Sequence, residues 1–342
     1  MSRHEMAKVC HRGAALLILR TFAILALGLL PLLPHSAISQ TQLKTHRLGL
    51  LSAGGPFTDA SKVVVGLTAG FSKRGYIVGS SLIFERRAAD AHPDRLPQLV
   101  DDLKSQTELM ITNAYAAARV MKDRSNVPVV AITGADPVAT GLIDSLARPG
   151  GKITGIGEVA AELSAKRLEV LKDAFPGLRK IAMLWNADDL GMTGRYKNAE
   201  AAARTLGFEI QPLGVREPED FAGAFAAMER DRPDAILMVT DALTGLNRKR
   251  VFEFAAEHKL PAIYEYDFLV RDGGLMSYGP DMSEVYDRAA DLADRIIRGA
   301  RPANLPFEQL THFRLVINKK TLETLGLTVP AATLMRADEV VE

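Results

Sequence analysis

Short apolar runs alternate with amphipathic stretches along most of the chain, which is the pattern of strands separated by helices. Strands joined by helices of this length predict parallel sheets with right-handed crossovers. We expect strands at 47–52, 82–87, 109–112, 129–132, 180–185, 209–213, 235–239, 261–264 and 274–277. We expect helices at 59–74, 93–105, 114–124, 161–175, 195–206, 218–230 and 247–258, and a short helix that begins at Pro137.

The alternation stops at a stretch rich in proline and glycine near residues 148–157 and then starts again. Two such series predict two similar α/β lobes. The C-terminal part departs from the rhythm, with a helix at 282–298, prolines at 302 and 306, a strand at 311–317 and a helix at 318–325. We expect these segments to cross back between the lobes. Lobe 1 is then 46–155 plus about 280–308, and lobe 2 is 156–279 plus about 309–342.

The N-terminal residues have the features of a secretory signal peptide. Arg3, Lys8 and Arg12 precede an apolar run at 21–33, and Ala37 offers a small residue before a cut. The alternative is a retained membrane anchor, but the strictly apolar run is shorter than the ~20 residues that a spanning helix needs. We therefore predict a cleaved signal at 1–37 and a periplasmic location.

Cleavage would change both the cysteine count and the charge. Cys10 is the only cysteine and precedes the apolar run, so a lipid-anchored cysteine is disfavoured and the mature chain has no disulfide or thiolate. Residues 1–37 hold four of the 42 basic and one of the 41 acidic residues, which leaves 38 against 40. A net charge near −2 argues against nucleic acid or an anionic membrane as a partner.

Familiar catalytic and metal-binding motifs are missing from the sequence. There is no G-x-S-x-G, H-E-x-x-H or G-x-x-x-x-G-K-[ST] pattern, and the histidines beyond residue 37 lack ligand spacing. Residues 155–160 match a degenerate dinucleotide-binding pattern, but they fall between the two series rather than at a first strand–helix turn. We interpret them as a crossover between lobes, and expect no cofactor and no metal.

Small or polar loops follow several expected strands and open the next helices. In open parallel sheets, ligands bind at the carboxyl ends of the strands, where helix N-termini attract carboxylates. Asp136 and Asp241 can instead hold an ammonium group. The aromatic candidates are Tyr264, Tyr266, Phe268 and Tyr278. Tyr264 and Tyr266 cannot both face the same way if one strand runs through them, but either can stack on a planar ligand. The alternative is that these polar residues are ordinary helix caps and turn formers. The candidate ligand-binding residues are Ser52, Asn113, Asp136, Asn186, Asp241, Tyr264 and Tyr278.

Several longer motifs resemble the ABC-transporter substrate-binding proteins related to the tryptophan-binding TrpX group. The resemblance runs from about Arg47 to Glu342, with the motifs in the same order. They are 136–142 (DPVATGL), 147–155 (ARPGGKITG), 260–264 (LPAIY), 273–280 (GGLMSYGP) and 315–318 (LVIN).

The resemblance implies a type I periplasmic-binding-protein fold, in which two Rossmann-like lobes with parallel sheets are joined by three crossovers around a cleft. It implies that Ser52, Asn113 and Asp136 face the cleft from the first lobe, and that Asn186, Asp241 and Tyr264 face it from the second. The chain departs from the family at 186–190 (NADDL), where the family often has Asn-Pro-x-x-Pro, and at 113–115 (NAY), where it tends to have Gly-[ST]-Pro. Because both departures lie at the expected cleft, the solute does not follow from the family.

The function expected from these features is that of a periplasmic solute receptor, which binds a small molecule without chemistry and delivers it to an ABC permease. The solute is an amino acid or an aromatic or carboxylate compound, and the receptor is expected to be a monomer. The alternative is a ligand-sensing periplasmic protein or a periplasmic enzyme on the same fold. An enzyme would need a convergent acid–base or nucleophile set, which the motifs do not provide.

Overall fold

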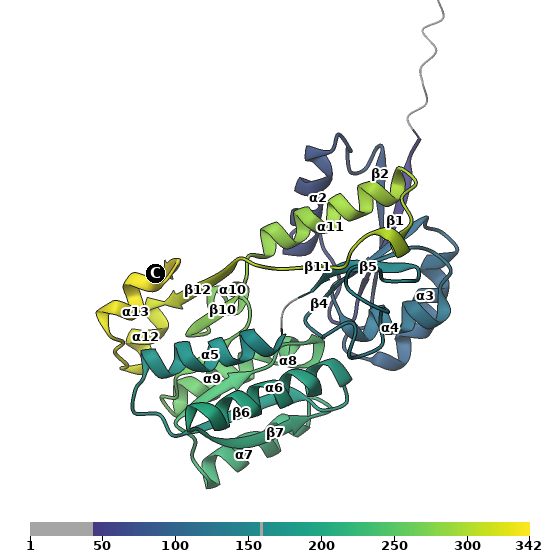
Figure 1. The fold of residues 1–342 in the computed structure, drawn as a ribbon. Coiled ribbons are helices and arrows are strands. Elements are labelled where there is room, and N and C mark those ends of the chain that lie inside the picture. Colours follow the sequence, from purple (N-terminus) through teal and green to yellow (C-terminus); the bar gives the residue numbers. More distant parts are fainter. Residues whose placement is uncertain (1–43, 158–159) are drawn as a thin grey trace, which may run out of the picture. The chain divides into compact units, whose positions relative to one another are not determined.

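The computed structural model describes residues 44–157 and 160–342, so the predicted signal peptide lies outside the described residues. These residues form two parallel-dominated sheets covered by helices (Figure 1). Within them, no helix combines the length and the apolar character needed to cross a membrane. The α/β class expected from the alternating pattern is confirmed.

The first sheet has six strands in the order β11-β5-β4-β3-β1-β2, and each pairing is parallel. Its strands are β1 (His46–Ser52), β2 (Leu82–Ala88), β3 (Leu109–Thr112), β4 (Val129–Thr133), β5 (Ile153–Gly157) and β11 (Glu308–Gln309). Its helical segments are α2 (Lys62–Lys73), η1 (Pro93–Arg95), α3 (Leu96–Lys104), α4 (Tyr115–Arg124), α11 (Met282–Ile297) and η2 (Pro302–Asn304).

The second sheet has seven strands in the order β13-β12-β10-β9-β8-β6-β7, with β10 and β12 antiparallel. Its strands are β6 (Lys180–Asn186), β7 (Glu209–Val215), β8 (Ala235–Met238), β9 (Ala262–Tyr264), β10 (Met276–Pro280), β12 (Phe313–Asn318) and β13 (Glu339–Val341). Its helices are α5 (Ala160–Ala174), α6 (Leu190–Leu206), α7 (Asp220–Arg230), α8 (Ala242–Leu246), α9 (Arg248–Glu257), α10 (Asp267–Arg271), α12 (Lys319–Leu325) and α13 (Ala331–Arg336).

Both sheets repeat one topology, because β2-β1-β3-β4-β5 and β7-β6-β8-β9-β10 follow the same strand order. In each, the order reverses beside the first strand of the series. A crevice opens at such a reversal, at the carboxyl ends of the strands. The reversal lies between β1 and β3 in the first sheet and between β6 and β8 in the second.

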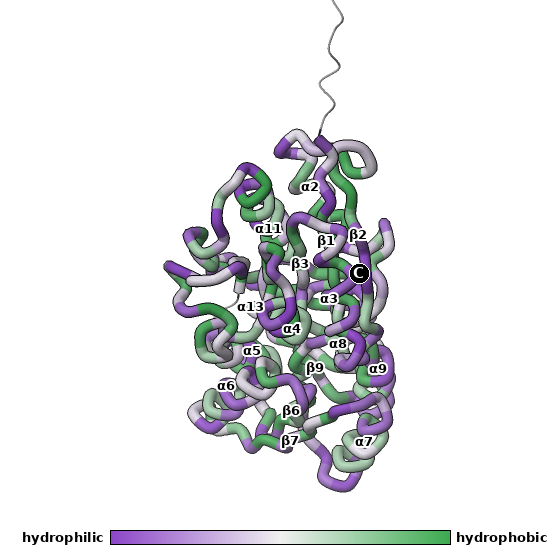
Figure 2. The backbone as a smooth tube through the Cα atoms, turned by 90° about the vertical axis from the view of Figure 1, so that its right-hand side faces the viewer, coloured by the Kyte–Doolittle hydropathy of each residue, from purple (hydrophilic) through white to green (hydrophobic). Residues whose placement is uncertain are grey.

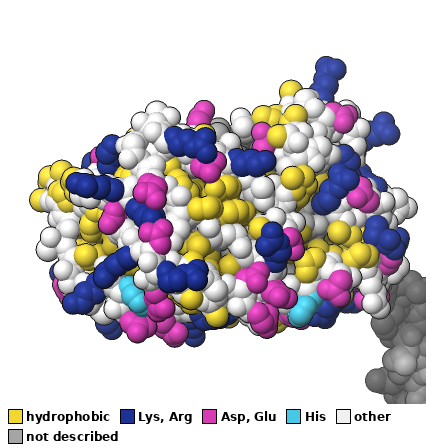
Figure 3. Space-filling model, turned by 90° about the horizontal axis from the view of Figure 1, so that it is seen from below, with side chains coloured by type: hydrophobic (Ala, Val, Ile, Leu, Met, Phe, Trp, Pro, Cys, Tyr) yellow, Lys and Arg dark blue, Asp and Glu magenta, His cyan; other side chains and the backbone are white. Residues whose placement is uncertain are grey.

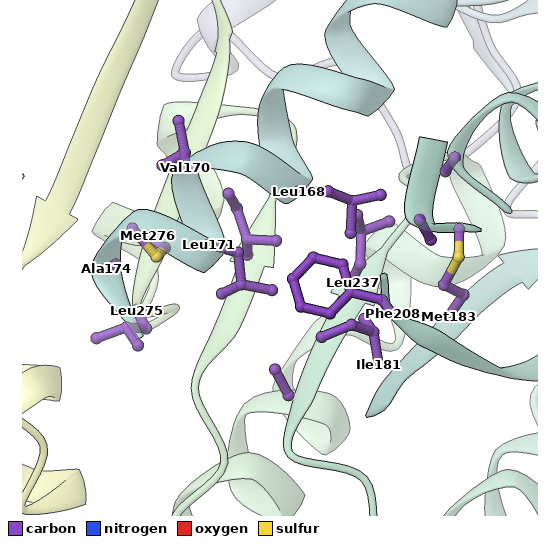
Figure 4. Close-up of a cluster of buried hydrophobic side chains, with 14 of the residues drawn as sticks. Leu168, Val170, Leu171, Ala174, Ile181, Met183, Phe208, Leu237, Leu275 and Met276 are labelled. Carbon is purple, nitrogen blue, oxygen red and sulfur yellow. The ribbon is translucent and has the colours of Figure 1, made fainter. Parts of the chain in front are cut away.

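Each sheet is covered by a hydrophobic cluster on each face. In the first sheet, α2 and α11 pack over one face and α3 and α4 over the other. In the second sheet, α5 contributes Leu168 and Leu171 to a cluster with Ile181, Phe208 and Leu237 (Figure 4). Hydrophobic stretches follow the interior strands, while hydrophilic ones gather in the peripheral turns (Figure 2).

The C-terminal part of the chain contributes elements to both sheets. Helix α11 follows β10 of the second sheet but packs on α2 of the first (Figure 1). Strand β11 then pairs with β5 in the first sheet, and β12, four residues later, pairs with β10 in the second. The short elements β11, α8, α10, α13 and β13 were not expected from the sequence.

The prediction of a short helix that begins at Pro137 is wrong. The segment forms a single turn, in which the Asp136 Oδ1 accepts hydrogen bonds from the N–H groups of Val138 and Ala139 at 2.9 and 3.0 Å. Gly141 then adopts φ +67°, a left-handed conformation that ends the turn. The Asp–Pro pair starts a helical turn as expected, but the glycine stops it.

Candidate ligand-binding site

A cavity of about 410 Å³ lies between the two sheets, and the carboxyl ends of their strands face it. We call the first sheet with its helices the first lobe and the second sheet with its helices the second lobe. The loops after β1, β3 and β4 line the cavity from the first lobe, and those after β6 and β8 line it from the second. The loops after β1, β3, β6 and β8 flank the strand-order reversals, where α/β folds bind ligands. The volume suits a small molecule of the size of an amino acid or a metabolite.

The second-lobe wall carries two partly buried carboxylates. Asp189 caps α6, and its Oδ1 accepts hydrogen bonds from the N–H groups of Gly191 and Met192 at 2.8 and 3.1 Å. Asp241 caps α8 in a capping box with Thr244. Its second oxygen, Oδ2, accepts a 2.6 Å hydrogen bond from Asn186 Nδ2.

Enclosure by protein changes the acidity of both carboxyl groups. Burial and the nearby charge of Asp241 raise the pKa of Asp189 to about 6. The hydrogen bonds from the Met192 and Gly191 N–H groups and the positive charge of Arg195, which also lines the cavity, oppose this rise. Burial also raises the pKa of Asp241. Two carboxylates that resist ionisation together are suited to a cation, which relieves both the desolvation and the mutual repulsion.

The first-lobe wall has the opposite character. Helix α4 begins beside the cavity, and its N-cap is Ala114, so no side chain of the described residues caps its first N–H groups. Ser52, at the end of β1, and Asn113, after β3, line the cavity next to this helix end. An uncapped helix N-terminus carries a partial positive charge and free donors, which favour an anion.

Aromatic rings enclose the cavity from both lobes. Tyr115 of α4 and Tyr286 of α11 are 8% and 6% exposed and lie on the first-lobe side. Tyr266 and Phe268 lie on the second-lobe side, with their rings stacked at a centroid distance of 5.9 Å and an interplanar angle of 11°. Planar aromatic surfaces on two sides favour a ligand with an apolar, flat part.

A buried ion network supports the second-lobe wall. Glu265 Oε1 accepts from Arg167 Nη1 at 3.0 Å and lies 2.6 Å from Arg195 Nη2, while its Oε2 accepts from the Thr240 N–H at 2.7 Å. Both arginine side chains are 1% exposed. Arg167 also donates to the Tyr278 carbonyl at 2.7 Å. The network ties α5, α6 and the loop after β9 together behind the cavity.

Four of the residues predicted from the sequence are brought together. Ser52 and Asn113 line the cavity from the first lobe, and Asn186 and Asp241 line it from the second. Asn186 and Asp241 also serve as the turn and cap residues that were the alternative interpretation. Asn186 Oδ1 accepts from the Asp188 N–H, and Asp241 caps α8. Capping and cavity lining are therefore compatible here.

The other three predicted residues lie outside the cavity lining. Asp136 is exposed at the surface, where it caps its own turn. Tyr264 is 1% exposed in the core of the second lobe, where burial raises its pKa well above the usual value. The Tyr278 side chain packs against Phe313 and against the hydrophobic cluster of that lobe that contains Leu168 and Leu171. The two tyrosines lie inside strands, whereas Tyr266 and Phe268, which follow the end of β9, line the cavity.

Sequence reasoning named Tyr266 and Phe268 among the aromatic candidates, but it missed Asp189, Arg195, Tyr115 and Tyr286. Asp189 was placed in a strand-end loop, but the helix after it was expected to begin at residue 195, so its capping role was not apparent. A signal was available, since an aspartate directly precedes a Leu-Gly-Met helix start. No local pattern marks Arg195, because its importance depends on Glu265, 70 residues away.

Metal-ligating and charged side chains do not form a second site among the residues that the structure describes. Within residues 44–157 and 160–342, no group of three or more His, Cys, Asp or Glu side chains has the arrangement of a metal site. On the face seen in Figure 3, basic and acidic side chains are interspersed, with apolar side chains between them.

The fold and the cleft define a class of protein, the type I periplasmic-binding-protein fold. A structure titled as the ABC domain in complex with L-Trp from Streptococcus pneumonia matches with a TM-score of 0.78 and 22% identity, over 86% of this chain and all of that chain. A conserved domain protein from Vibrio cholerae matches with a TM-score of 0.81 and 22% identity, over 87% of this chain and all of that chain. The leucine-binding protein LivK from Thermotoga maritima shares the fold more distantly, with a TM-score of 0.51 and 13% identity over 68% of this chain and 69% of its own.

The family follows from the sequence match. Residues 58–341 match the model of the ABC transporter substrate binding protein family, and the chain belongs to that family. A curated relative, the tyrosine-binding protein of Clostridioides difficile, is 26% identical over 215 residues, which are 63% of this chain and 61% of the relative. The chain thus matches less than two thirds of that relative's length. The resemblance inferred from the motifs is confirmed.

Proposed function

We propose that this protein is the solute receptor of an ABC importer and that it binds an α-amino acid with an aromatic side chain in the cavity, without altering it. The observation that carries the proposal is the opposite character of the two walls. The second-lobe wall presents the carboxylates of Asp189 and Asp241, and the first-lobe wall presents the uncapped N-terminus of α4.

A zwitterion satisfies both walls at once. Its ammonium group would lie between Asp189 and Asp241, where burial makes an uncompensated negative charge costly. Its carboxylate would accept hydrogen bonds from the N–H groups at the start of α4, beside Ser52. A ligand oriented in this way joins the two lobes through its own charges.

The aromatic side chain is supported by the lining and by the relatives. Tyr115 and Tyr286 on one lobe, and Tyr266 and Phe268 on the other, give the cavity flat apolar surfaces. A curated relative is a tyrosine-binding protein, and a structural relative holds L-Trp. Both ligands are aromatic α-amino acids, and we propose the same class here.

Transport follows from the population of the closed form. A ligand that contacts both lobes binds the closed arrangement more tightly than an open one and shifts the population toward it. A membrane permease that recognises the closed form would then receive only loaded receptor. The predicted signal at 1–37 supports a periplasmic site for this exchange.

Calorimetry with a matched set of analogues tests the proposal. L-tryptophan and L-tyrosine are expected to bind, tryptamine tests the loss of the carboxylate, and indole-3-propionate tests the loss of the ammonium group. Each analogue should bind about 10- to 100-fold more weakly than L-tryptophan, because it loses hydrogen bonds to a charged group. L-leucine controls for the aromatic ring.

The outcomes separate the possible functions. Failure of every aromatic amino acid to bind overturns the ligand class. Equal binding of tryptamine and L-tryptophan overturns the role of α4. Mass spectrometry of the ligand after incubation checks for chemistry, and a changed ligand would favour the enzyme alternative.

A further inference from the structure

We propose that the receptor closes by docking the first turns of α6 onto the turn at residues 134–135, and that Gly191 and Gly134 are required because no side chain fits between these surfaces. The inference rests on the proposed solute-receptor function, and it names the residues that limit closure. Helix α6 belongs to the second lobe, and the 134–135 turn follows β4 of the first.

Gly191 is the first half of this contact. A methyl group built on Gly191 would lie 2.5 Å from the Cβ of Ala135, 3.1 Å from the Oδ1 of Asp189 and 3.3 Å from the Cδ1 of Tyr115. Asp189 belongs to the same helix cap as Gly191, whereas Ala135, the nearest of the three, and Tyr115 belong to the first lobe. Carbon atoms in contact stand about 3.5–4.0 Å apart, so alanine at this position would force the lobes apart or displace the backbone.

Gly134 is the second half of the contact, with the roles of the lobes exchanged. A methyl group built on Gly134 would overlap Nη1 of Arg195 and lie 2.9 Å from its Cζ. The guanidinium has little freedom to move away, because Arg195 is 1% exposed and its Nη2 lies 2.6 Å from Glu265 Oε1. The buried ion network therefore holds the arginine against the first lobe.

Local structure accounts for the glycine at 191 less well than the contact with Ala135, because the local neighbour, Asp189 Oδ1, would lie 3.1 Å from a methyl group and Ala135 Cβ only 2.5 Å. In a helix, glycine costs about 1 kcal/mol relative to alanine, and Gly191 has no positive φ that would favour it. Gly194 lies one turn further along the same helix, and a methyl group there would meet nothing within 4 Å among the described residues. The two glycines are alike in helix propensity and differ in what lies across the cavity.

The position of this contact links it to ligand binding. Gly191 lies two residues after Asp189 and directly before Met192, and both of these line the cavity. Docking of α6 therefore carries the carboxylate proposed to hold the ammonium group toward the first lobe. Closure at 134–135 and completion of the binding site are one movement.

A disulfide reporter measures closure without a ligand. A methyl group on Gly54 would lie 3.6 Å from the Cβ of Ala242 across the cavity rim, which is within the Cβ–Cβ range of a disulfide. Gly54→Cys and Ala242→Cys, in a Cys10→Ser background, should therefore cross-link with oxidised glutathione only when the lobes are closed. The rate of cross-linking follows the closed population.

Three variants are compared in this background. Gly191→Ala should slow cross-linking about tenfold, because overpacking opposes the closed form. Gly194→Ala is the matched control and should leave the rate unchanged. Ala135→Gly removes the nearest atom, so adding it to Gly191→Ala should restore most of the rate, a coupling that damage to α6 alone does not produce.

Ligand affinity is measured on the same substitutions without the reporter cysteines, with L-tryptophan and L-tyrosine as probes. Gly191→Ala should weaken binding about tenfold and Gly194→Ala should not. Unchanged cross-linking in Gly191→Ala, or no rescue by Ala135→Gly, overturns the closure contact whether or not a ligand binds. Normal closure behaviour with no binding of either amino acid overturns the proposed ligand class instead.

Discussion

Asp189 makes ligand binding dependent on pH in a way that the cavity geometry specifies. In the ligand-free protein, burial and the neighbouring Asp241 raise the pKa of Asp189 to about 6. Only the ionised carboxylate attracts an ammonium group. Affinity should therefore be high above pH 6 and fall as the pH drops through this value.

The size of the effect follows from the fraction of Asp189 that is ionised. With a pKa of about 6, about nine tenths of the carboxyl groups are ionised at pH 7 and about one tenth at pH 5. Binding of L-tryptophan should thus weaken about tenfold between these pH values. The ligand remains a zwitterion throughout, because its carboxyl group titrates below this range and its ammonium group above it.

Isothermal calorimetry in buffers of matched ionic strength measures this profile directly. Asp189→Asn is the control, since asparagine is an equally good helix cap and cannot titrate. Its affinity should be low and should change little between pH 7 and pH 5. A wild-type affinity that is constant over this range would refute the placement of the ammonium group at Asp189. So would a profile that survives in Asp189→Asn.

Three further predictions test other parts of the cavity. Asp189→Asn should raise the free energy of unfolding of the ligand-free protein by up to about 3 kcal/mol at pH 7 and above. The reason is that the pKa of Asp189 is higher in the folded than in the unfolded protein, so its ionisation opposes folding. Scanning calorimetry should find no such gain near pH 4. Ala114→Asp should stabilise the protein by about 1 kcal/mol, because aspartate caps α4. It should also weaken L-tryptophan binding at least 10-fold, because the aspartate carboxylate takes the position proposed for the ligand carboxylate. Tighter binding in calorimetry would contradict this. Glu265→Gln should lower stability by about 3–5 kcal/mol in urea unfolding, because it removes the charge between Arg167 and Arg195, and a change under 1 kcal/mol would show that the network is not needed.

The elements that the sequence predicted correctly are those whose signal is local. Strands β1, β3, β4, β6 and β8 each appear as short aliphatic runs, because a strand buried on both faces must be apolar throughout. The repeated strand–helix rhythm predicted two α/β lobes. The turn at Pro137 was mispredicted because the helix start at Asp136 is a local signal, whereas its early end depends on the conformation of Gly141.

The positions of the candidate site residues could be predicted from the sequence only in part. Ser52, Asn113, Asn186 and Asp241 line the cavity as expected, because polar residues at the carboxyl ends of parallel strands meet at one edge of the sheet. Their role in ligand binding stays a prediction. Tyr264 lies outside the cavity lining because it is a residue of β9, and both faces of this sheet are covered by hydrophobic clusters. Its ring lies in the core beside Phe252.

The sequence by itself determined the class of fold, the family and the edge of each sheet at which the cavity lies, because each depends on periodicity and on residues close together in the chain. Only the tertiary structure decided the polarity of the cleft. Ala114 and Asp189 are 75 residues apart. Ala114 leaves the start of α4 uncapped, whereas Asp189 caps α6 with a carboxylate, and the two helix ends give the cavity walls of different charge because both open onto the same cavity. The same holds for Gly191, which is an ordinary weak helix residue in the sequence. It becomes a necessary gap only when Ala135 of the other lobe lies against it.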